Sequence, residues 1–237
     1  MCPMADSANK IAMTLTRVPL FSGLTESELK FLTDRVVTRR FAAGELVFGE
    51  GEPCKGLFIV ESGQLRIFKT SSGGREQVLS IDGPGSSIAE LPVFDGGVYP
   101  ASAMAIEDAV LLLVGKQDFQ ALCLTHAEVG LKVLRVVGGR LRRLVGIIEE
   151  LSFTTVRHRP ASYLLRLAQK SGQRTAEGIV VSLPVNNQEL AAQIGTVREL
   201  VSRNLSRLQA EGLVKIDGRN VILCDLKALA DKVESPE

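Results

Sequence analysis

The side chains best suited to recognising another molecule gather in one short stretch near the carboxyl end of the chain. Arg198, Glu199, Ser202 and Arg203 stand within two helical turns of one another. Arginine can donate two parallel hydrogen bonds to O6 and N7 of guanine, glutamate can accept one from N4 of cytosine, and serine can bond a base or a phosphate. A run of lysines would bind phosphates without reading bases, so this mixed set predicts a surface that reads DNA sequence.

Two helix starts separated by a glycine surround this stretch. Asn186 with Glu189 has the capping-box pattern, Thr196 with Glu199 repeats it, and Gly195 stands where a first helix must end and the chain must turn. This order is typical of a helix-turn-helix, whose second helix carries the reading side chains. The apolar stripe expected to bury that second helix consists of Leu200, Val201, Leu205 and Leu208.

A short hairpin is predicted after the second helix. Residues 213–216 and 219–223 are strand-like runs around Asp217-Gly218, a dipeptide typical of tight hairpin turns. This hairpin would be the wing of a winged helix-turn-helix. Basic side chains on these elements favour binding to DNA phosphates, and they are Arg198, Arg203, Arg207 and Arg219.

Plainer interpretations stay open for several of these residues. Glu199 could cap its own helix, Arg207 could be an ordinary solvated charge, and Arg219 an ordinary hairpin residue. A helix-turn-helix can also dock another protein rather than DNA.

A long helix must precede this region, because the apolar periodicity changes there. Apolar residues recur at alternating steps of three and four, which is the pattern of a coiled-coil seam. The seam consists of Leu134, Val137, Leu141, Leu144, Ile148 and Leu151. Charged residues fill the other faces, so we expect the helix to pair with a second copy of the chain in a homodimer. The alternative is that the stripe packs on the rest of its own chain.

The part of the chain before this helix is rich in short β-prone runs broken by glycines. Runs at 57–60, 65–68 and 78–81 lie in a region from Val36 to Val114 whose turns are marked by glycine. Short strands at this spacing predict a small sandwich or barrel. A short helix is expected ahead of them, since Thr25 and Glu28 form another capping-box pattern.

Length and composition limit the class of protein. The chain has 237 residues, 45% of them hydrophobic, and a formal charge of +1, which favours two domains and a local rather than global basic surface. The four cysteines are scattered without a C-x-x-C pair, so neither a zinc site nor a disulfide framework is expected. No apolar run approaches a membrane span and no secretion signal is evident, so we expect a cytoplasmic protein that does not bind membranes.

Catalytic patterns are missing from the sequence. It has no nucleophile-base pair, no group of metal ligands and no glycine-rich phosphate loop, so we expect no enzyme and no metal site. The competing class is a regulatory subunit with a nucleotide-binding barrel and no DNA binding.

Three motifs together resemble one family. Residues 41–51 and 57–63 are similar to the first half of a cyclic-nucleotide-binding barrel, and 198–203 is similar to a recognition helix. The chain therefore resembles, from about Leu20 to Leu226, the cyclic-AMP receptor protein and fumarate-nitrate reduction regulator (Crp/Fnr) family of bacterial transcription regulators, and its Glu-x-x-Ser-Arg pattern resembles the fumarate-nitrate reduction branch.

The resemblance implies an α+β fold in three parts. Residues 1–118 would form a double-stranded β-helix (jelly-roll) barrel that senses an effector, 119–152 a coiled-coil dimerisation helix, and 153–237 a winged helix-turn-helix. It implies base contacts from Glu199, Ser202 and Arg203 within a TTGAT-N4-ATCAA-like palindrome, and RNA polymerase as a further partner. The residues it places at DNA phosphates are Asn187, Gln188 and Arg219.

The effector site departs from the family pattern. Cyclic-AMP binders carry Phe-Gly-Glu-Leu and then Arg-Ser or Arg-Thr, and the matching residues here are Ile88, Ala89, Glu90, Leu91, Tyr99, Pro100, Ala101 and Ser102. Pro100 stands in the place of the phosphate-binding arginine, so a cyclic phosphate loses its charge-assisted partner. The residues that bind the base from the long helix fall on Leu144 and Val145. We therefore expect an effector pocket that does not bind cyclic AMP.

Two other cofactors, an iron-sulfur cluster and a haem, would need ligands from side chains of this sequence. An iron-sulfur cluster is not expected, because that branch needs a group of N-terminal cysteines and only Cys2 is present. A haem that senses nitric oxide or carbon monoxide stays open, with His126, His158, Met104 and Cys2 as candidate ligands. The sequence identifies neither the effector nor the direction of regulation.

Overall fold

The computed structural model describes residues 3–153, 155–183 and 186–234. The described chain separates into two compact units, one made of Met1–Lys69 and Leu79–Arg143 and the other of Thr70–Val78 and Leu144–Glu237. Each unit has its own hydrophobic core. The predicted α+β fold is confirmed, with a β-sheet domain, a long helix and a helix-turn-helix in that order along the chain.

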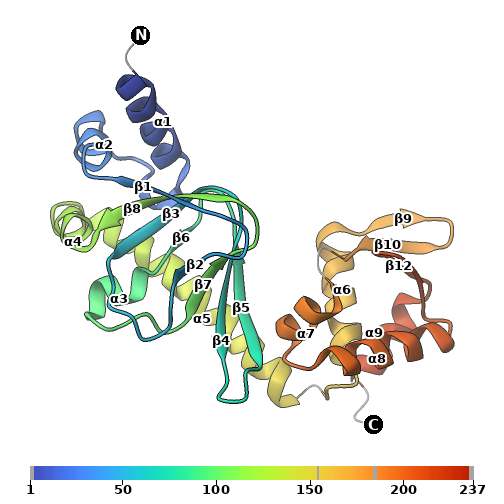
Figure 1. Ribbon diagram of the computed structural model, residues 1–237. Helices are drawn as coiled ribbons and strands as arrows, with labels where there is room; N and C mark the ends of the chain where they lie inside the picture. The colour runs from blue at the N-terminus through green and yellow to red at the C-terminus, as the bar shows by residue number, and fades with distance from the viewer. Residues whose placement is uncertain (1–2, 154, 184–185, 235–237) are drawn as a thin grey trace. The chain divides into compact units, whose positions relative to one another are not determined.

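The first unit is built on two four-stranded sheets (Figure 1). One has the order β1-β8-β3-β6 and the other β2-β7-β4-β5. Their strands are β1 (Val37–Phe41), β2 (Leu46–Phe48), β3 (Gly56–Ser62), β4 (Leu65–Thr70), β5 (Glu76–Asp82), β6 (Ser87–Ile88), β7 (Ser102–Ala105) and β8 (Ala109–Gly115). The predicted runs at 57–60, 65–68 and 78–81 lie in β3, β4 and β5 and are confirmed as strands.

Strand β3 is buried on both faces, which explains its unbroken apolar sequence. Phe58 and Val60 point into the barrel and join a core with Leu65 and Leu111. Leu57 and Ile59 point to the other side and join a core built with helices. Because neighbouring side chains of a strand face opposite ways, a strand between two cores needs an apolar residue at every position.

Helices cover the outer face of β3 and β8. They are α1 (Pro3–Arg17), the 3-10 turn η1 (Pro19–Phe21), α2 (Glu26–Thr33), α4 (Lys116–Thr125) and the first half of α5 (Ala127–Phe153). Leu15, Phe21, Leu32, Phe119 and Val133 pack together in this core. The predicted capping box of α2 is confirmed, since the Glu28 N–H donates to Thr25 Oγ1 and a Glu28 carboxylate oxygen accepts from the Thr25 N–H at 2.6 Å.

The second unit contains a helical core and a small sheet. Its elements after α5 are α6 (Arg159–Ser171), β9 (Gln173–Thr175), β10 (Gly178–Ser182), α7 (Asn187–Ile194), α8 (Arg198–Ala210), β11 (Val214–Asp217), β12 (Asn220–Leu223) and α9 (Leu226–Glu234). The sheet has the order β11-β12-β10-β9. Leu164, Leu190, Val201, Val221 and Leu229 are fully buried together, so helices and sheet share one core.

Candidate DNA interface, helix seam and effector pocket

Helix α7 begins at a complete N-terminal cap. Oδ1 of Asn186 accepts hydrogen bonds from the N–H groups of Gln188 at 2.9 Å and Glu189 at 3.0 Å. A carboxylate oxygen of Glu189 accepts in turn from the Asn186 N–H at 3.2 Å. The first predicted capping box is therefore confirmed. The first turn of α7 presents Gln188, which is exposed, and Asn187, which is half-buried.

The second predicted capping box is wrong. Helix α8 begins at Arg198 with Val197 as its N-cap, and no side chain caps it. Thr196 is buried, and its N–H donates to the Ala191 carbonyl oxygen at 2.9 Å. The backbone of Thr196 thus belongs to the cap that closes α7, where Gly195 has a left-handed conformation with φ of 67° and the first helix ends as predicted. Glu199 consequently has no capping role.

A buried arginine that sequence analysis missed closes the same turn. Nη1 of Arg159 donates to the carbonyl oxygens of Gly195 at 2.9 Å and Ile194 at 3.3 Å, and its Nη2 donates to that of Leu151 at 3.0 Å. These are carbonyls that the helix end leaves without intrahelical partners. No sequence pattern could indicate this role, because Arg159 and the turn lie more than thirty residues apart.

The outer face of α8 carries the predicted reading residues. Arg198, Glu199, Ser202 and Arg203 are all exposed. None of the four makes a hydrogen bond or ion pair with another residue that the structure describes. The opposite face is buried through Val201, Asn204, Leu205 and Leu208, while Leu200 is half-buried. The four polar side chains are therefore free to bind a partner.

Arg207 differs from these four. Its Nε donates to a carboxylate oxygen of Glu211 at 2.8 Å, and the residue is half-buried. Lys232 from α9 pairs with the other carboxylate oxygen of Glu211 at 2.6 Å. Arg207 therefore belongs to an ion-pair network that links α8 to α9.

The wing hairpin is present with a turn shifted by one residue from the predicted one. Asp217 pairs with Asn220, so the two central residues are Gly218, with φ of 57°, and Arg219. A glycine with positive φ at the first central position is one that tight hairpins require. The shift leaves Arg219 exposed at the tip, where its carbonyl oxygen accepts from the Leu183 N–H at 2.7 Å.

Helix α5 carries two apolar faces. Val129 and Val133 are buried in the core of the first unit, and Val137 packs partly against it. Leu134, Leu141 and Ile148 are exposed by 66%, 62% and 62%. Leu144 and Leu151 are exposed by 36% and 37%. Packing on its own barrel therefore uses a different face, and most of the predicted seam has no partner within the described chain.

The predicted effector residues lie around a filled barrel interior. Tyr99 is fully buried and stacks on Phe48 with ring centroids 3.9 Å apart. Its hydroxyl oxygen accepts from the Lys55 N–H at 3.0 Å, and burial raises the pKa of Tyr99 to about 12. Ile88 and Ala101 pack in the same core. The apolar and aromatic side chains at these positions fill the centre of the barrel.

The remaining predicted effector residues are dispersed. Pro100 and Leu91 are exposed, and Ser102 Oγ accepts from the Glu50 N–H at 3.0 Å. On α5, Leu144 and Val145 are exposed. These positions stay predictions, since they neither line one described cavity nor converge on one point.

Ala89 holds a strained backbone conformation. Its φ of 69° makes it the one non-glycine residue of the described chain with positive φ. It caps α3 (Glu90–Asp95), at the position where the family pattern has glycine. The left-handed conformation costs an alanine about 1–2 kcal/mol, so the turn that places Glu90 is kept in spite of a Cβ atom.

Glu90 is a buried carboxyl next to one arginine. Its side chain accepts a short hydrogen bond from Ser87 Oγ, and a carboxylate oxygen lies 3.5 Å from Arg140 Nη2. Asp82 lies 3.6 Å from the same nitrogen. Burial raises the pKa of Glu90 and the charge of Asp82 adds to this, although Arg140 and Ser87 act in the opposite direction. Arg140 also donates to the Ser87 carbonyl oxygen.

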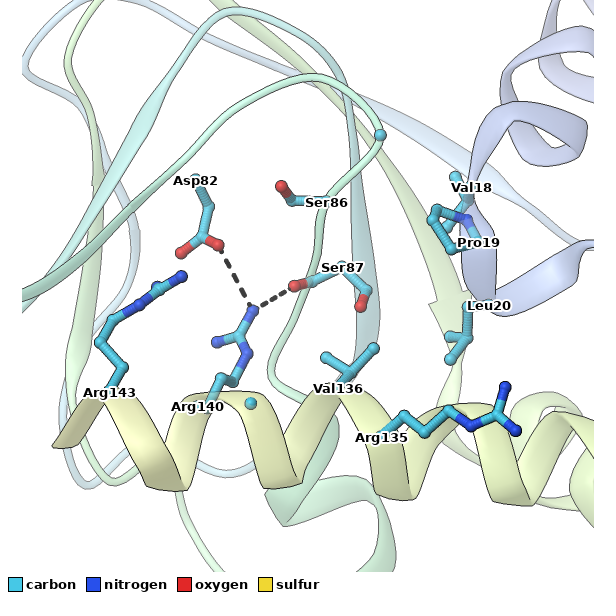
Figure 2. Close-up of a pocket in the computed structure, with 12 residues that line it drawn as sticks. Val18, Pro19, Leu20, Asp82, Ser86, Ser87, Arg135, Val136, Arg140 and Arg143 are labelled. Atoms are coloured by element: carbon cyan, nitrogen blue, oxygen red, sulfur yellow. Dashed lines mark hydrogen bonds and ion pairs between the residues drawn. The ribbon is translucent and has the colours of Figure 1, made fainter. Parts of the chain in front are cut away.

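A cavity of about 330 Å³ lies beside this cluster, between α5, the loop before β6 and the η1 turn (Figure 2). Arg135, Arg140 and Arg143 project from α5 along it, and Asp82, Ser86 and Ser87 stand opposite. Sequence analysis missed this site, because its arginines are spread through the charged positions of a predicted coiled coil. The one available signal was the spacing of Arg135 and Arg143, which are eight residues or about two helical turns apart.

The candidate haem ligands are already engaged. Nε2 of His126 lies 3.0 Å from a carboxylate oxygen of Glu28, and His158 Nδ1 lies 3.2 Å from Thr155 Oγ1 in the other unit. The Met104 sulfur accepts from Arg66 at 3.3 Å. These three residues do not fit an axial ligand set in the barrel, and Cys2 lies outside the described residues. The described residues include no group of three or more histidine, cysteine or acidic side chains that could hold a metal ion.

None of the described helices is long and apolar enough to cross a membrane.

Comparisons with known proteins agree with this architecture. A family model described as cyclic nucleotide-binding domain matches residues 38–126, and one described as Crp-like helix-turn-helix domain matches residues 158–232. The chain is 32% identical over 216 residues to a CRP-like cAMP-activated global transcriptional regulator of Mycobacterium tuberculosis, which covers 91% of this chain and 96% of the relative. It is 34% identical over 198 residues to the cyclic AMP receptor protein of Thermus thermophilus, covering 84% and 88%.

Among solved structures, a CooA mutant from Carboxydothermus hydrogenoformans superposes with a TM-score of 0.72 at 25% identity, covering 84% of this chain and 88% of that one.

The buried carboxyl of Glu90 generates a pH-dependent prediction. The folded state holds the Glu90 proton more tightly than the unfolded state, so wild-type stability falls as the pH rises from 4.5 through the raised pKa. Glu90→Gln buries no charge and avoids this loss. We therefore expect the thermal midpoint of Glu90→Gln, relative to wild type, to increase as the pH rises from 4.5 through the raised pKa of Glu90.

The matched control is Glu107→Gln, an exposed glutamate of the same unit, whose midpoint is expected to track wild type. A Glu90→Gln difference that stays constant or shrinks with rising pH would contradict the assignment.

Proposed function

The chain belongs to the Crp/Fnr family of DNA-binding transcription regulators with an effector-binding domain, and from this premise we propose that it acts as a homodimer. In this proposal α8 reads a TTGAT-N4-ATCAA-like palindrome, and an effector other than cyclic AMP controls it. The single observation that supports it most is the row of exposed, unpartnered Arg198, Glu199, Ser202 and Arg203 on α8.

The spacing of these four side chains suits a major groove. Arg198 with Ser202, and Glu199 with Arg203, are four residues apart, so they lie on one face of the helix. The groove admits one helix, and residues in the first turns of a recognition helix contact base edges. Glu199 has no capping bond to satisfy, which leaves its carboxylate for cytosine N4. Arg203 would donate to guanine, and Ser202 would bond a base or a phosphate.

Phosphate contacts would surround this reading face. Asn187 and Gln188 stand in the first turn of α7, where the helix dipole favours an anion and their side-chain amides can donate hydrogen bonds to it. Arg219 stands at the exposed tip of the wing. These contacts would orient α8 on the duplex without adding sequence information.

A homodimer would cover the exposed stripe of α5. The exposed Leu134, Leu141 and Ile148 repeat every seven residues, and water-exposed leucine at such spacing is stabilised by a second helix. The dimer-seam residues Leu134, Val137, Leu141, Leu144, Ile148 and Leu151 are proposed on this ground. Two copies would present two copies of α8 to half-sites one helical turn apart.

The effector is proposed to be something other than cyclic AMP, although the two relatives described above carry cyclic AMP in their names. Pro100 offers neither charge nor N–H where the family pattern has an arginine, and the stacked Tyr99 and Phe48 fill the barrel beside it. A cyclic phosphate there would lose its charge-assisted hydrogen bonds without a replacement.

Three further proposals follow from family membership. The relatives are transcription regulators, which supports a protein that is not an enzyme. RNA polymerase as a partner and a cytoplasmic location are proposed on the same ground.

DNA sequence recognition by α8 can be tested with gel shifts. In gel-shift titrations the full chain is expected to prefer a TTGAT-N4-ATCAA duplex over a scrambled one. Arg203→Ala should lose about 1–3 kcal/mol on the specific duplex and little on the scrambled one, because only base contacts distinguish them. Arg174→Ala, an exposed arginine on β9, is the control.

Equal losses of Arg203→Ala on both duplexes would reject base reading by Arg203. Wild-type protein with no preference at all would instead favour a regulatory subunit that does not read DNA.

The second prediction concerns the seam. Sedimentation equilibrium is expected to give wild type twice the 25.6 kDa mass of one chain. Leu141→Glu places a charge in the helix-helix contact and should shift the protein to monomer without unfolding it, since this side chain is 62% exposed in one chain. Leu124→Glu, at an 88% exposed leucine outside the seam, should stay dimeric. A monomeric wild type would reject the seam.

The third prediction separates the haem alternative. Since His126, His158 and Met104 are engaged elsewhere, the purified chain mixed with haem is expected to show no stoichiometric Soret band. A sharp Soret band that is lost in His126→Ala or in a variant lacking Cys2 would instead support the alternative hypothesis, a haem that senses nitric oxide or carbon monoxide.

A further inference from the structure

The cavity beside α5 has a wall of positive charge. Arg135, Arg140 and Arg143 line it from one helix, and Asp82 is the one acidic residue of its lining (Figure 2). Arg140 is paired with Asp82 and Glu90, and Arg135 and Arg143 contribute two positive charges that no described carboxylate pairs with. Its volume of about 330 Å³ lies at the lower end of the range for small-molecule sites.

The three arginines are not equivalent. Arg140 is held by Asp82, Glu90 and the Ser87 carbonyl oxygen, so its role is to position the loop before β6. Arg135 and Arg143 are exposed and make no hydrogen bond or ion pair with any described residue. Their donors are therefore available to a ligand, and each can donate a bidentate pair to an oxyanion.

The α5 position midway between these two arginines has no side chain. Gly139 lies midway between them on the same face of α5, four residues from each. A Cβ atom built there would meet no other atom within 4 Å. On the opposite wall the Ser86 hydroxyl makes no hydrogen bond within the described chain. The glycine thus leaves open the space that lies between two free cationic groups and a free hydroxyl.

We propose that this cavity binds the phosphate group of a small phosphorylated molecule, with Arg135 and Arg143 as its ligands and Ser86 as a hydrogen-bond partner. The proposal rests on the proposed function, because it identifies the chemical class of the effector. A phosphate monoester carries close to two negative charges at neutral pH, which matches the two positive charges of Arg135 and Arg143. A carboxylate would leave one positive charge uncompensated.

The positive charge of this site comes from α5, whereas the cyclic-AMP binders of the family use an arginine at the position of Pro100. The cassette position Pro100 cannot bind an anion, whereas the arginines of α5 can. A phosphate held by Arg135 and Arg143 would contact the helix whose other face carries Leu134 and Leu141. Ligand binding would therefore act directly on the element that the dimer is proposed to share.

The test is calorimetric titration of the full chain at constant ionic strength, since salt screens exposed charges. The probes are glucose 6-phosphate, inorganic phosphate, cyclic AMP and citrate. Wild type is expected to bind glucose 6-phosphate. In the double variant Arg135→Gln/Arg143→Gln the affinity should fall by about tenfold or more, because two charge-assisted pairs are lost.

Two further variants separate charge from shape. Arg142→Gln removes an exposed arginine of the same helix that does not line the cavity, and its affinity should stay within about twofold of wild type. Gly139→Leu keeps every charge and favours the helix, yet its side chain would fill the space between the two arginines and should abolish binding.

Several results would overturn the proposal. One is that the wild-type chain binds neither glucose 6-phosphate nor inorganic phosphate. Another is that citrate or cyclic AMP binds as tightly as glucose 6-phosphate. A third is that Arg142→Gln loses as much affinity for glucose 6-phosphate as the double variant does. A monomeric double variant would assign the arginines to subunit pairing instead. Binding of inorganic phosphate alone would retain the phosphate site and reject a sugar phosphate as its source.

Gel shifts of the same variants without any probe keep the two proposals apart. Their DNA affinity is expected to stay within about twofold of wild type, since the cavity residues are not reading residues. For the wild-type chain, no phosphate binding with DNA sequence preference present would reject only the phosphate site, and no sequence preference with phosphate binding present would reject only the proposed palindrome.

Discussion

The turn between α7 and α8 is the constraint on which the recognition surface depends. Gly195 adopts a conformation that few other residues tolerate, Thr196 is used to close α7, and the buried Arg159 satisfies the carbonyl oxygens that remain. Helix α8 begins at Arg198 with no side-chain cap, so the Glu199 carboxylate is not used to cap its own helix. That is why Glu199, together with Arg198, stays free on the outer face.

Different faces of helix α5 serve the core, the proposed ligand site and the proposed dimer contact. Val129 and Val133 anchor it in the core of the first unit, the exposed leucines form a stripe for a second helix, and the arginines border a cavity. One helix therefore contacts the core of the first unit and carries the residues proposed to bind the ligand and the partner. A ligand that favours one position of this helix would shift the equilibrium of everything attached to it.

The effector domain combines a preserved backbone with altered side chains. Ala89 keeps the left-handed conformation of a family glycine at a cost of about 1–2 kcal/mol, and Glu90 keeps its buried place beside Arg140. By its resemblance to the cyclic-AMP binders, however, Pro100 stands where they carry an anion-binding arginine, and Tyr99 is fully buried in the interior. The strained backbone at Ala89 is kept while the anion-binding arginine is missing. This combination is consistent with a barrel that still senses a ligand but recognises one other than cyclic AMP.

The sequence by itself determined the order of the elements, the cap at Asn186, the α5 stripe and the outward position of the four residues proposed to read DNA, because each depends on neighbours within one or two helical turns. The same local rules placed β3 correctly but left α1 outside the predicted elements and put a second cap at Thr196. Only the tertiary structure decided that Thr196 is buried, that Arg159 closes the turn and that Arg135, Arg140 and Arg143 share a cavity with the loop before β6. Those facts join residues far apart in the chain, and contacts at such separations are set by packing, which no local periodicity encodes.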